Sequence, residues 1–193
     1  LIIERALHWY SVAHNLRAAA LRYFNAAGAD PDTGIGEDHD PETHLIPLVI
    51  ETALGRRSHV EIFGTDYPTA DGSAVRDYIL VTDLATAHVQ ALERLKSGSE
   101  NLFLNLGTGT GYSVKEVIAM VEQVSGRAVT AHMSARRPGD PAELVAANGR
   151  AGEILGWKPQ HSGLQNIIET ALRWHKMHGP EEAASGTQQA TSL

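Results

Sequence analysis

The chain has 193 residues, no cysteine, 42% hydrophobic residues and a formal net charge of -7. This composition fits a folded chain with a sizeable core, and the lack of cysteine excludes disulfides, thiol nucleophiles and cysteine zinc sites. No apolar run approaches the ~20 residues of a membrane helix, which excludes a membrane span, and the acidic balance argues against nucleic acid as a partner. The absence of cysteine is compatible with the cytoplasm, which is the compartment that we expect.

The first residues carry a helical pattern. Ile3, Leu7, Tyr10 and Val12 recur near one stripe, which predicts an amphipathic helix. No Ser, Thr, Asp or Asn precedes this helix to cap its free N–H groups. We therefore expect that the chain begins inside a helix and is the C-terminal portion of a longer protein.

Strand and helix patterns alternate after this helix. The near-continuous apolar run at 18–24 predicts a strand that is covered on both faces. Residues 28–44 are rich in Asp, Pro, Gly and Thr and predict a long loop, of the kind that often carries function. The further elements expected are strands at 60–63, 75–81, 102–106 and 129–133, helices at 45–54, 84–95, 113–124 and 162–177, and a short helix that ends at Gly156.

Several helix ends carry recognisable capping residues. Thr82 or Asp83 is expected to cap the helix that follows residue 81, and capping-box patterns begin at Ser113 and Ser162. Gly179 stops the last helix, and residues 180–193 are expected to form a disordered tail. The alternation predicts an α/β fold with parallel strands, in which the loops after strands hold ligands.

Two patterns that suggest cofactor or metal chemistry favour structural roles. Residues 107–111 are G-x-G-x-G rather than the dinucleotide fingerprint G-x-G-x-x-G, which favours a tight structural turn. His175 and His178 lie three apart on a helix, but no companion carboxylate stands at a recognisable spacing. The ten histidines are therefore interpreted as solvated or core residues, and no metal site is expected.

Arginine and aspartate residues gather in two short segments. Arg76 and Asp77 lie in one expected strand, and Arg136, Arg137 and Asp140 lie within one turn. Guanidinium groups match phosphate oxygens with two hydrogen bonds, and a carboxylate can accept from a ribose hydroxyl. These residues suggest a nucleotide site, while the alternative is that they pair with one another or with solvent.

Five segments of the chain together resemble one family. They are LRYFNAAGADPDTGIGED at 21–38, HLIPLV at 44–49, the segment 62–92, NLGTGTGYSVKEV at 105–117 and RRPGDPAELVA at 136–146. This combination resembles the UDP-glucose 4-epimerases, which belong to the extended short-chain dehydrogenase/reductases. The insert at 66–72, ahead of Val75-Arg76-Asp77-Tyr78, is characteristic of these epimerases.

The resemblance implies an incomplete Rossmann sheet with a smaller α/β substrate domain. Residues 1–27 and 75–107 match parts of the NAD-binding domain, and residues 28–74 and 108–179 match the UDP-sugar domain. The family interconverts UDP-galactose and UDP-glucose through an NAD-dependent 4-keto intermediate, and the full-length protein is expected to be a homodimer. The alternatives are a non-catalytic fragment that binds UDP-sugars weakly, and an epimerase or dehydratase of another nucleotide sugar.

The resemblance also implies that the reacting groups lie outside this chain. The family's Gly-rich NAD turn and its Tyr-x-x-x-Lys pair would precede Leu1, so no catalytic residue is expected here. The cofactor contacts that remain are expected at Tyr23 and Phe24, which match positions near the nicotinamide. What this chain retains is the substrate half.

The expected substrate contacts differ in what they would touch. Asn25, His44 and Leu45 match positions at the diphosphate and sugar, although the family usually has Asn where this chain has His44. Glu61 and Phe63 match the strand that pairs its backbone with uracil. Arg76 and Arg137 match the arginines that bind the diphosphate. Asp140 matches the acid that binds the ribose, and Leu144 matches the wall of the sugar pocket.

Overall fold

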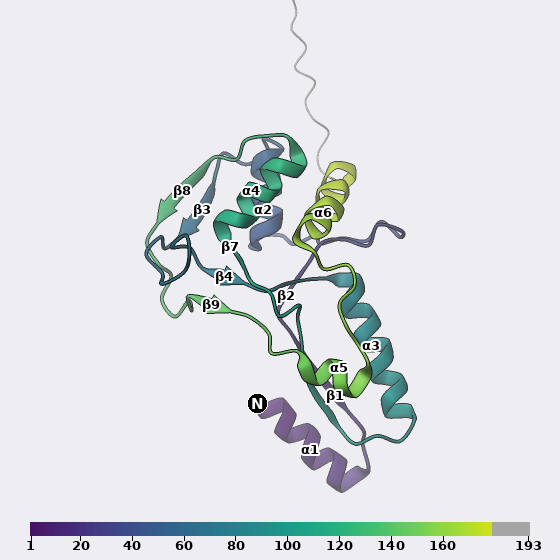
Figure 1. Ribbon diagram of the computed structural model, residues 1–193. Coiled ribbons are helices and arrows are strands. Elements are labelled where there is room, and N and C mark those ends of the chain that lie inside the picture. The colour runs from purple at the N-terminus through teal and green to yellow at the C-terminus, as the bar shows by residue number, and fades with distance from the viewer. Residues whose placement is uncertain (179–193) are drawn as a thin grey trace, which may run out of the picture.

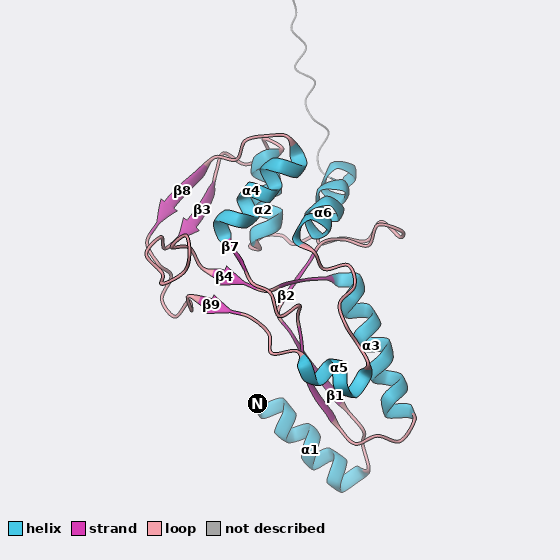
Figure 2. Cartoon of the chain, in the orientation of Figure 1, coloured by secondary structure: helices cyan, strands magenta, loops and turns pink. Residues whose placement is uncertain are grey.

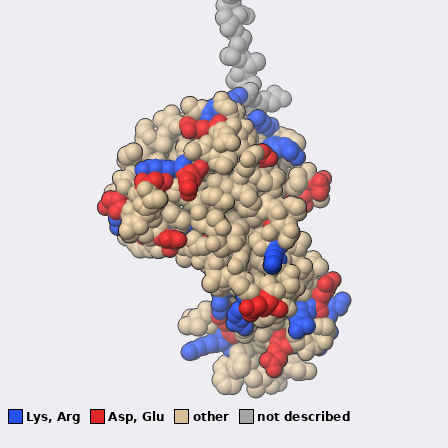
Figure 3. Space-filling model, viewed as in Figure 1, with Lys and Arg blue, Asp and Glu red and all other residues tan. Residues whose placement is uncertain are grey.

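The computed structural model describes residues 1–178 as two lobes joined by a narrower waist (Figure 1, Figure 3). The tail that was expected to be disordered, residues 180–193, lies outside the described residues. Helices and strands alternate along the chain (Figure 2), and four of the five pairings between the named strands are parallel. The predicted α/β class is confirmed.

One lobe is built around a two-stranded parallel sheet. Its elements are α1 (Ile2–His14), β1 (Ala19–Tyr23), α3 (Val81–Lys96), β6 (Leu102–Leu106) and α5 (Gly149–Leu155). Helices α3 and α5 pack on the sheet, and an ion pair between Glu4 and Arg22 joins α1 to β1. The prediction that β1 is covered on both faces is wrong, because no residue of β1 is fully buried, Arg22 and Tyr23 are exposed, and α1 buries no residue.

The other lobe combines three helices with two small sheets. Its elements are α2 (Leu45–Ala53), β3 (Val60–Phe63), β4 (Val75–Arg76), β7 (Tyr112–Ser113), α4 (Val114–Ser125), β8 (Ala131–Ser134), β9 (Glu143–Leu144) and α6 (Leu164–His178). Strand β3 pairs with β8, and β4 lies between β7 and β9. Helices α2, α4 and α6 enclose the largest apolar core, in which Ile50, Val117, Val121, Ile167 and Ile168 are fully buried.

The waist is a third strand pair with its own core. Strands β2 (Asn25–Ala27) and β5 (Tyr78–Leu80) run parallel, and β5 leads directly into α3. Beside them, Ile79, Leu106 and Trp157 belong to a second buried cluster. Because the cluster also contains Leu84 of α3 and Ala151 of α5, it joins these two helices to β5 and β6.

The strand and helix expected between 75 and 95 differ in detail from the structure. Asp77 interrupts the strand, so that β4 and β5 are separate pieces. The cap expected at Thr82 or Asp83 is wrong, because α3 begins at Val81 with no side-chain cap. Asp83 instead accepts hydrogen bonds from the backbone N–H groups of Gln160 (3.1 Å) and His161 (2.9 Å).

The two capping-box predictions had different outcomes. Ser113 accepts from the Glu116 backbone N–H at 3.0 Å while Glu116 accepts from the Ser113 N–H at 2.7 Å, which confirms the first box. The second prediction is wrong, because the Ser162 hydroxyl donates to Asp83 at 2.6 Å and accepts from the Leu80 N–H at 2.9 Å. The Ser162 hydroxyl, which the local pattern predicts to cap a helix, is therefore hydrogen-bonded to the carboxylate of Asp83, a residue that is distant in sequence.

Charged side chains are mixed on the molecular surface. On the face drawn in Figure 3, Lys and Arg side chains alternate with Asp and Glu side chains and form no broad area of one sign. Within residues 1–178, no helix combines the length and the apolarity that crossing a bilayer requires.

Candidate functional site

A cavity of about 480 Å³ opens among α2, β3, β4 and the loop at 136–142. The walls therefore come from segments that lie far apart in the sequence. Eight of the nine expected substrate contacts line this cavity, namely Asn25, His44, Leu45, Glu61, Phe63, Arg76, Arg137 and Asp140.

Asp140 joins two arginines at one end of the cavity. Its Oδ1 accepts from Arg76 Nη2, and its Oδ2 accepts from Arg137 Nη2 at 3.0 Å. The Arg76 side chain is only 14% exposed and also donates to the backbone oxygens of Val75 and Pro141, whereas Arg137 is 60% exposed. Two guanidiniums and one carboxylate leave a net positive charge, so this end of the cavity favours an anion.

Strand β3 turns an unpaired backbone edge toward the cavity. Among the described residues it pairs with β8 alone, and the N–H groups of Val60 and Gly64 donate to β8 and its flank at 2.9 Å. Because strand residues alternate in direction, the backbone groups of Glu61 and Phe63 point to the opposite edge. Both residues line the cavity, so this edge offers donors and acceptors to a planar ligand.

The side chains on β3 already have partners. Glu61 accepts from the Ser134 hydroxyl and lies 3.1 Å from His59 Nε2. These contacts lower the pKa of Glu61, and the hydrogen bond from Ser134 is the largest cause. The Phe63 ring centre lies 4.9 Å from the guanidinium carbon of Arg137, which is a cation–π contact. The backbone, and not the Glu61 carboxylate, is therefore the group that this strand can offer.

The first turn of α2 forms another wall of the cavity. The helix begins after His44 with no side-chain cap and no acidic residue in its first turn, so its N–H groups favour a negatively charged ligand. Asn25 lies across from this turn and donates from Nδ2 to the Asp77 backbone oxygen at 2.8 Å. That bond uses the amide nitrogen, so the side-chain oxygen of Asn25 is the group available to a ligand.

Some lining residues were missed by the sequence reasoning. Tyr78 resembled an ordinary core residue of a strand, and its side chain is buried, which raises its pKa to about 12 and keeps the hydroxyl protonated. Glu37 and Glu42 also line the cavity but were read as part of a polar loop. The alternation of Glu37 and Glu42 with His39 and His44 is the sequence feature that could have marked these two glutamates as site residues.

Three expected site residues lie outside the cavity lining. Leu144, on β9, pairs with Arg76 and is 46% exposed. Tyr23 ends β1 with its side chain exposed, and the Phe24 N–H donates to the Leu106 oxygen at 3.2 Å. Their roles stay predictions.

The glycine-rich turn at 107–111 holds a carboxylate of the protein itself. Asp77 is fully buried and accepts from the backbone N–H groups of Thr108 (2.9 Å) and Gly109 (3.0 Å). A Cβ at Gly107 would lie 2.4 Å from the Cβ of Ala146, so this glycine permits close packing. The turn offers no cradle for the pyrophosphate of a dinucleotide, because its N–H groups are already bonded to Asp77.

Comparisons with known proteins agree on one family. Residues 1–107 match the NAD dependent epimerase/dehydratase family. The UDP-glucose 4-epimerase of Halalkalibacterium halodurans is 52% identical over 178 residues, which are 92% of this chain and 53% of that protein. The UDP-glucose 4-epimerase of Rhizobium meliloti is 53% identical over 174 residues, which are 90% of this chain and 53% of that protein.

Solved structures show the same relationship. UDP-glucose 4-epimerase from Brucella ovis in complex with NAD superposes with a TM-score of 0.86 at 51% identity, over 89% of this chain and 53% of that one. The enzyme from Bifidobacterium longum in complex with NAD+ and UDP gives 0.83 at 36% identity, over 92% of this chain and 53% of that one. The chain thus spans about half the length of the curated relatives it matches. It belongs to the NAD dependent epimerase/dehydratase family.

Proposed function

We propose that this chain carries the UDP-sugar-binding half of a UDP-glucose 4-epimerase, which interconverts UDP-galactose and UDP-glucose. The observation that carries the proposal is that one cavity unites two arginines, a helix N-terminus and an open strand edge. These are groups that suit a diphosphate and a planar base, which are the two constant parts of UDP. The relatives with about 50% identity carry this enzyme's name.

The diphosphate would lie between Arg76, Arg137 and the first turn of α2. Both guanidiniums donate to Asp140 in the ligand-free chain, so a phosphate would take over part of that hydrogen bonding. Asp140 would then be free to accept from a ribose hydroxyl. The side-chain oxygen of Asn25 and the backbone N–H of Leu45, next to His44, would lie toward the sugar side of the diphosphate.

The base would lie against β3. Uracil has an N–H between two carbonyl oxygens, which complements the alternating carbonyl and N–H groups of Glu61 and Phe63. The Phe63 ring lies under Arg137, so base and diphosphate would be held by neighbouring groups.

Anchoring of UDP is the contribution that this half makes to the reaction. Inversion at C4 requires the sugar to present both faces to the same reacting groups, so the sugar must turn about its diphosphate link while UDP stays fixed. Charge-assisted hydrogen bonds of ~1.5–3 kcal/mol each make two arginines an adequate tether. In such an enzyme NAD supplies hydride transfer to and from the sugar.

The residues described here do not by themselves form a site for NAD. The turn at 107–111 is filled by Asp77, which leaves Tyr23 and Phe24, at the end of β1, as the proposed approach to the nicotinamide. None of the five tyrosines in the 193 residues is followed four positions later by lysine. Turnover is therefore proposed for the full-length protein and not for this chain alone.

The predicted domain division and setting remain proposals. Residues 1–27 and 75–107 would belong to the NAD-binding domain, and 28–74 and 108–179 to the substrate domain, although α5 packs on β6 and α3 and so lies with the first group. The full-length protein is proposed to be a cytoplasmic homodimer. These proposals rest on the resemblance of the sequence to the UDP-glucose 4-epimerases.

Calorimetric titration of the chain with UDP tests the binding proposal. Arg137→Ala is expected to weaken UDP binding by roughly 1.5–3 kcal/mol, because a charged partner of the diphosphate is lost. Arg136→Ala is the matched control, since that guanidinium donates to Asp66 at 2.7 Å and lies 4.2 Å from the Tyr67 ring centre. Equal losses in both variants, or no binding of UDP by the parent chain, would refute the proposal.

Leu144 needs a separate test, because it lies outside the cavity lining. Leu144→Ala is expected to leave UDP affinity within about 0.5 kcal/mol of the parent, as for a substitution away from the ligand contacts. In the full-length protein the same variant is expected to raise turnover of an N-acetylated UDP-sugar relative to UDP-galactose. If the ratio of the two turnover rates stays unchanged, Leu144 is not part of the sugar pocket.

A further inference from the structure

Four side chains of the loop at 28–44 converge at the rim of the cavity. They are the carboxylates of Glu37 and Glu42 and the imidazoles of His39 and His44. One ligand atom from each lies within 4.8 Å of every other. The four residues follow one another at intervals of two, three and two, so a single turn of chain builds the whole cluster.

The distances inside the cluster match those between the ligands of a small cation. Glu37 Oε1 lies 2.6 Å from His44 Nδ1 and 3.0 Å from His39 Nδ1. Glu42 lies 3.1 Å from His44 Nδ1 and 3.8 Å from His39 Nδ1 through its two oxygens. Ligands bound tetrahedrally at the usual zinc distances are about 3.4 Å apart, which lies within this range and above three of its four distances, so a bound ion would move these three pairs of atoms slightly apart.

The charges of the cluster favour a divalent cation. The side chains of Glu37 and Glu42 are only 16% and 15% exposed. The two carboxylates each place an oxygen within 4.8 Å of the other, so their negative charges repel each other. A dication would neutralise both while the imidazoles stay uncharged, and the imidazoles, at 56% and 57% exposed, leave an open side for its entry.

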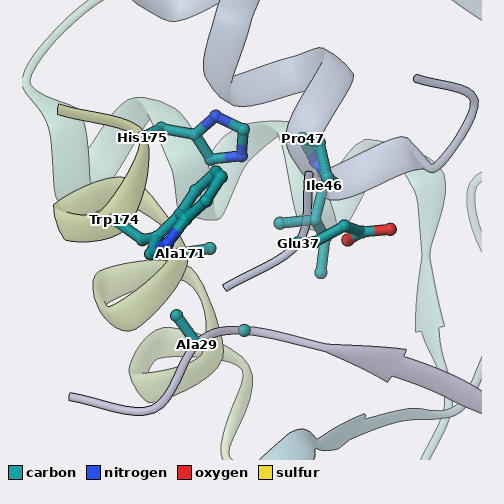
Figure 4. A pocket seen from close by; sticks show the side chains of 8 residues that line it. Ala29, Glu37, Ile46, Pro47, Ala171, Trp174 and His175 are labelled. Carbon is teal, nitrogen blue, oxygen red and sulfur yellow. The ribbon is translucent and has the colours of Figure 1, made fainter. Parts of the chain in front are cut away.

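The loop that carries the cluster is held against two helices. A Cβ at Gly36 would lie 2.4 Å from Trp174 Cγ, so the backbone beside Glu37 packs directly on α6. Glu37, Ile46 of α2 and Trp174 of α6 line one small pocket, and Figure 4 shows the Glu37 carboxylate directed away from the tryptophan. Glu42 is fixed by the backbone N–H groups of Thr43 and His44, which donate to it at 2.6 and 2.7 Å.

We propose that Glu37, His39, Glu42 and His44 form a binding site for a divalent transition-metal ion of the zinc class. Two imidazole nitrogens and two carboxylate oxygens are a ligand set that zinc accepts, and they exclude the oxygen-rich shell that calcium requires. Coordination through Nδ1 would leave Nε2 of each imidazole as a hydrogen-bond donor. The site does not depend on the proposed function, because metal binding needs no nucleotide.

Titration of the chain with ZnCl2 and with CoCl2, without nucleotide, tests the site. We expect one equivalent of either metal per chain and, with cobalt, the visible absorption of a four-coordinate ion. His39→Ala and Glu42→Gln are each expected to lower the affinity at least about tenfold, because even partners outside the coordination shell cost 10- to 100-fold. Gln at 42 keeps an oxygen for the two N–H groups, so this variant preserves the loop.

The matched control is His132→Ala. His132 lies with His59 and Glu61 in a second His/Glu cluster on the β3–β8 sheet, and its ring stacks on His59 with centres 4.1 Å apart. The control is expected to bind metal like the parent. Equal loss in all three variants, loss in His132→Ala alone, or no stoichiometric binding by the parent would overturn the proposal.

Discussion

Asp77 is a buried charge whose neighbours are all hydrogen-bond donors. One carboxylate oxygen accepts from the N–H and the hydroxyl of Thr108, and the other accepts from the N–H groups of Gly109 and Ala146. Three separated segments therefore meet at one side chain. Its role is structural, and it explains why the glycine-rich turn beside it lies so close to the end of β9.

Asp77→Asn is expected to lower the free energy of unfolding by roughly 2–4 kcal/mol. The substitution keeps the shape of the side chain but turns an NH2 group toward N–H donors, which leaves buried polar groups unpaired. Urea unfolding followed by circular dichroism measures the change, and Asp32→Asn on an exposed turn is the control. A midpoint shift no larger than that of the control would contradict this role of Asp77.

His175 predicts how stability depends on pH. Its burial lowers its pKa from the ordinary value of about 6.5, although Glu51 partly opposes the shift. Below that ordinary value the unfolded chain binds a proton that the folded chain resists, so stability present above pH 6.5 is lost as the pH falls. In His175→Gln the unfolding midpoint should decline less between pH 7 and pH 5, and parallel declines in the two proteins would exclude His175 as the cause.

The site residues differ in how far the sequence could reveal them. Arg76, Arg137 and Asp140 lie in short polar segments, where their chemistry alone suggested an anion. The four-residue cluster at 37–44 lies in a loop, where its spacing of two, three and two residues follows no helical or strand periodicity. The open edge of β3 could not be predicted from residue types, because whether an edge is free depends on which strands pair with each other.

At the scale of single elements, hydroxyl groups show why local patterns succeed or fail. Ser113 and Ser162 both stand three positions before Glu or Gln at an expected helix start. Ser113 donates to Asp71 and still accepts from the Glu116 N–H of its own helix, whereas Ser162 donates to Asp83, which is 79 residues away, and accepts from the Leu80 N–H instead. Helix and strand positions were otherwise well predicted from periodicity, because burial of one face fixes them locally.

Ser113→Ala is expected to destabilise the chain by about 1–2 kcal/mol. The variant removes the cap of α4 and also the hydrogen bond to Asp71, in a residue that is 4% exposed. Chemical unfolding of this variant should be compared with Ser97→Ala, whose hydroxyl is exposed at the end of α3. If the two variants unfold at the same denaturant concentration, the cap contributes nothing.

At the scale of the whole molecule, the two lobes differ in how well they are packed. The lobe of α2, α4 and α6 encloses the largest core, whereas α1 buries none of its residues. Ile2, Ile3, Trp9 and Val12 of α1 are between 66% and 85% exposed. Such a continuous apolar surface is a place where other apolar groups bind.

A hydrophobic dye is therefore expected to bind the native chain at α1. Replacing Ile3→Lys and Trp9→Gln together should reduce dye fluorescence strongly while the unfolding midpoint stays nearly constant, because neither side chain is part of a core. Fluorescence titration and thermal unfolding of the same samples provide the comparison. Undiminished fluorescence would locate the apolar surface elsewhere, and a large fall in midpoint would show that α1 supports the core.

The open edge of β3 has a consequence for how nucleotide choice can evolve, if the proposed function holds. A base that is recognised by main-chain N–H and carbonyl groups is recognised by atoms that every amino acid except proline possesses. Cytosine has an amino group and an unprotonated nitrogen where uracil has a carbonyl and an N–H, so the same edge would repel it. Point substitutions at Glu61 or Phe63, other than to proline, would leave this discrimination intact. Only a change in strand register, or a new strand pairing, could redirect the protein to a different base.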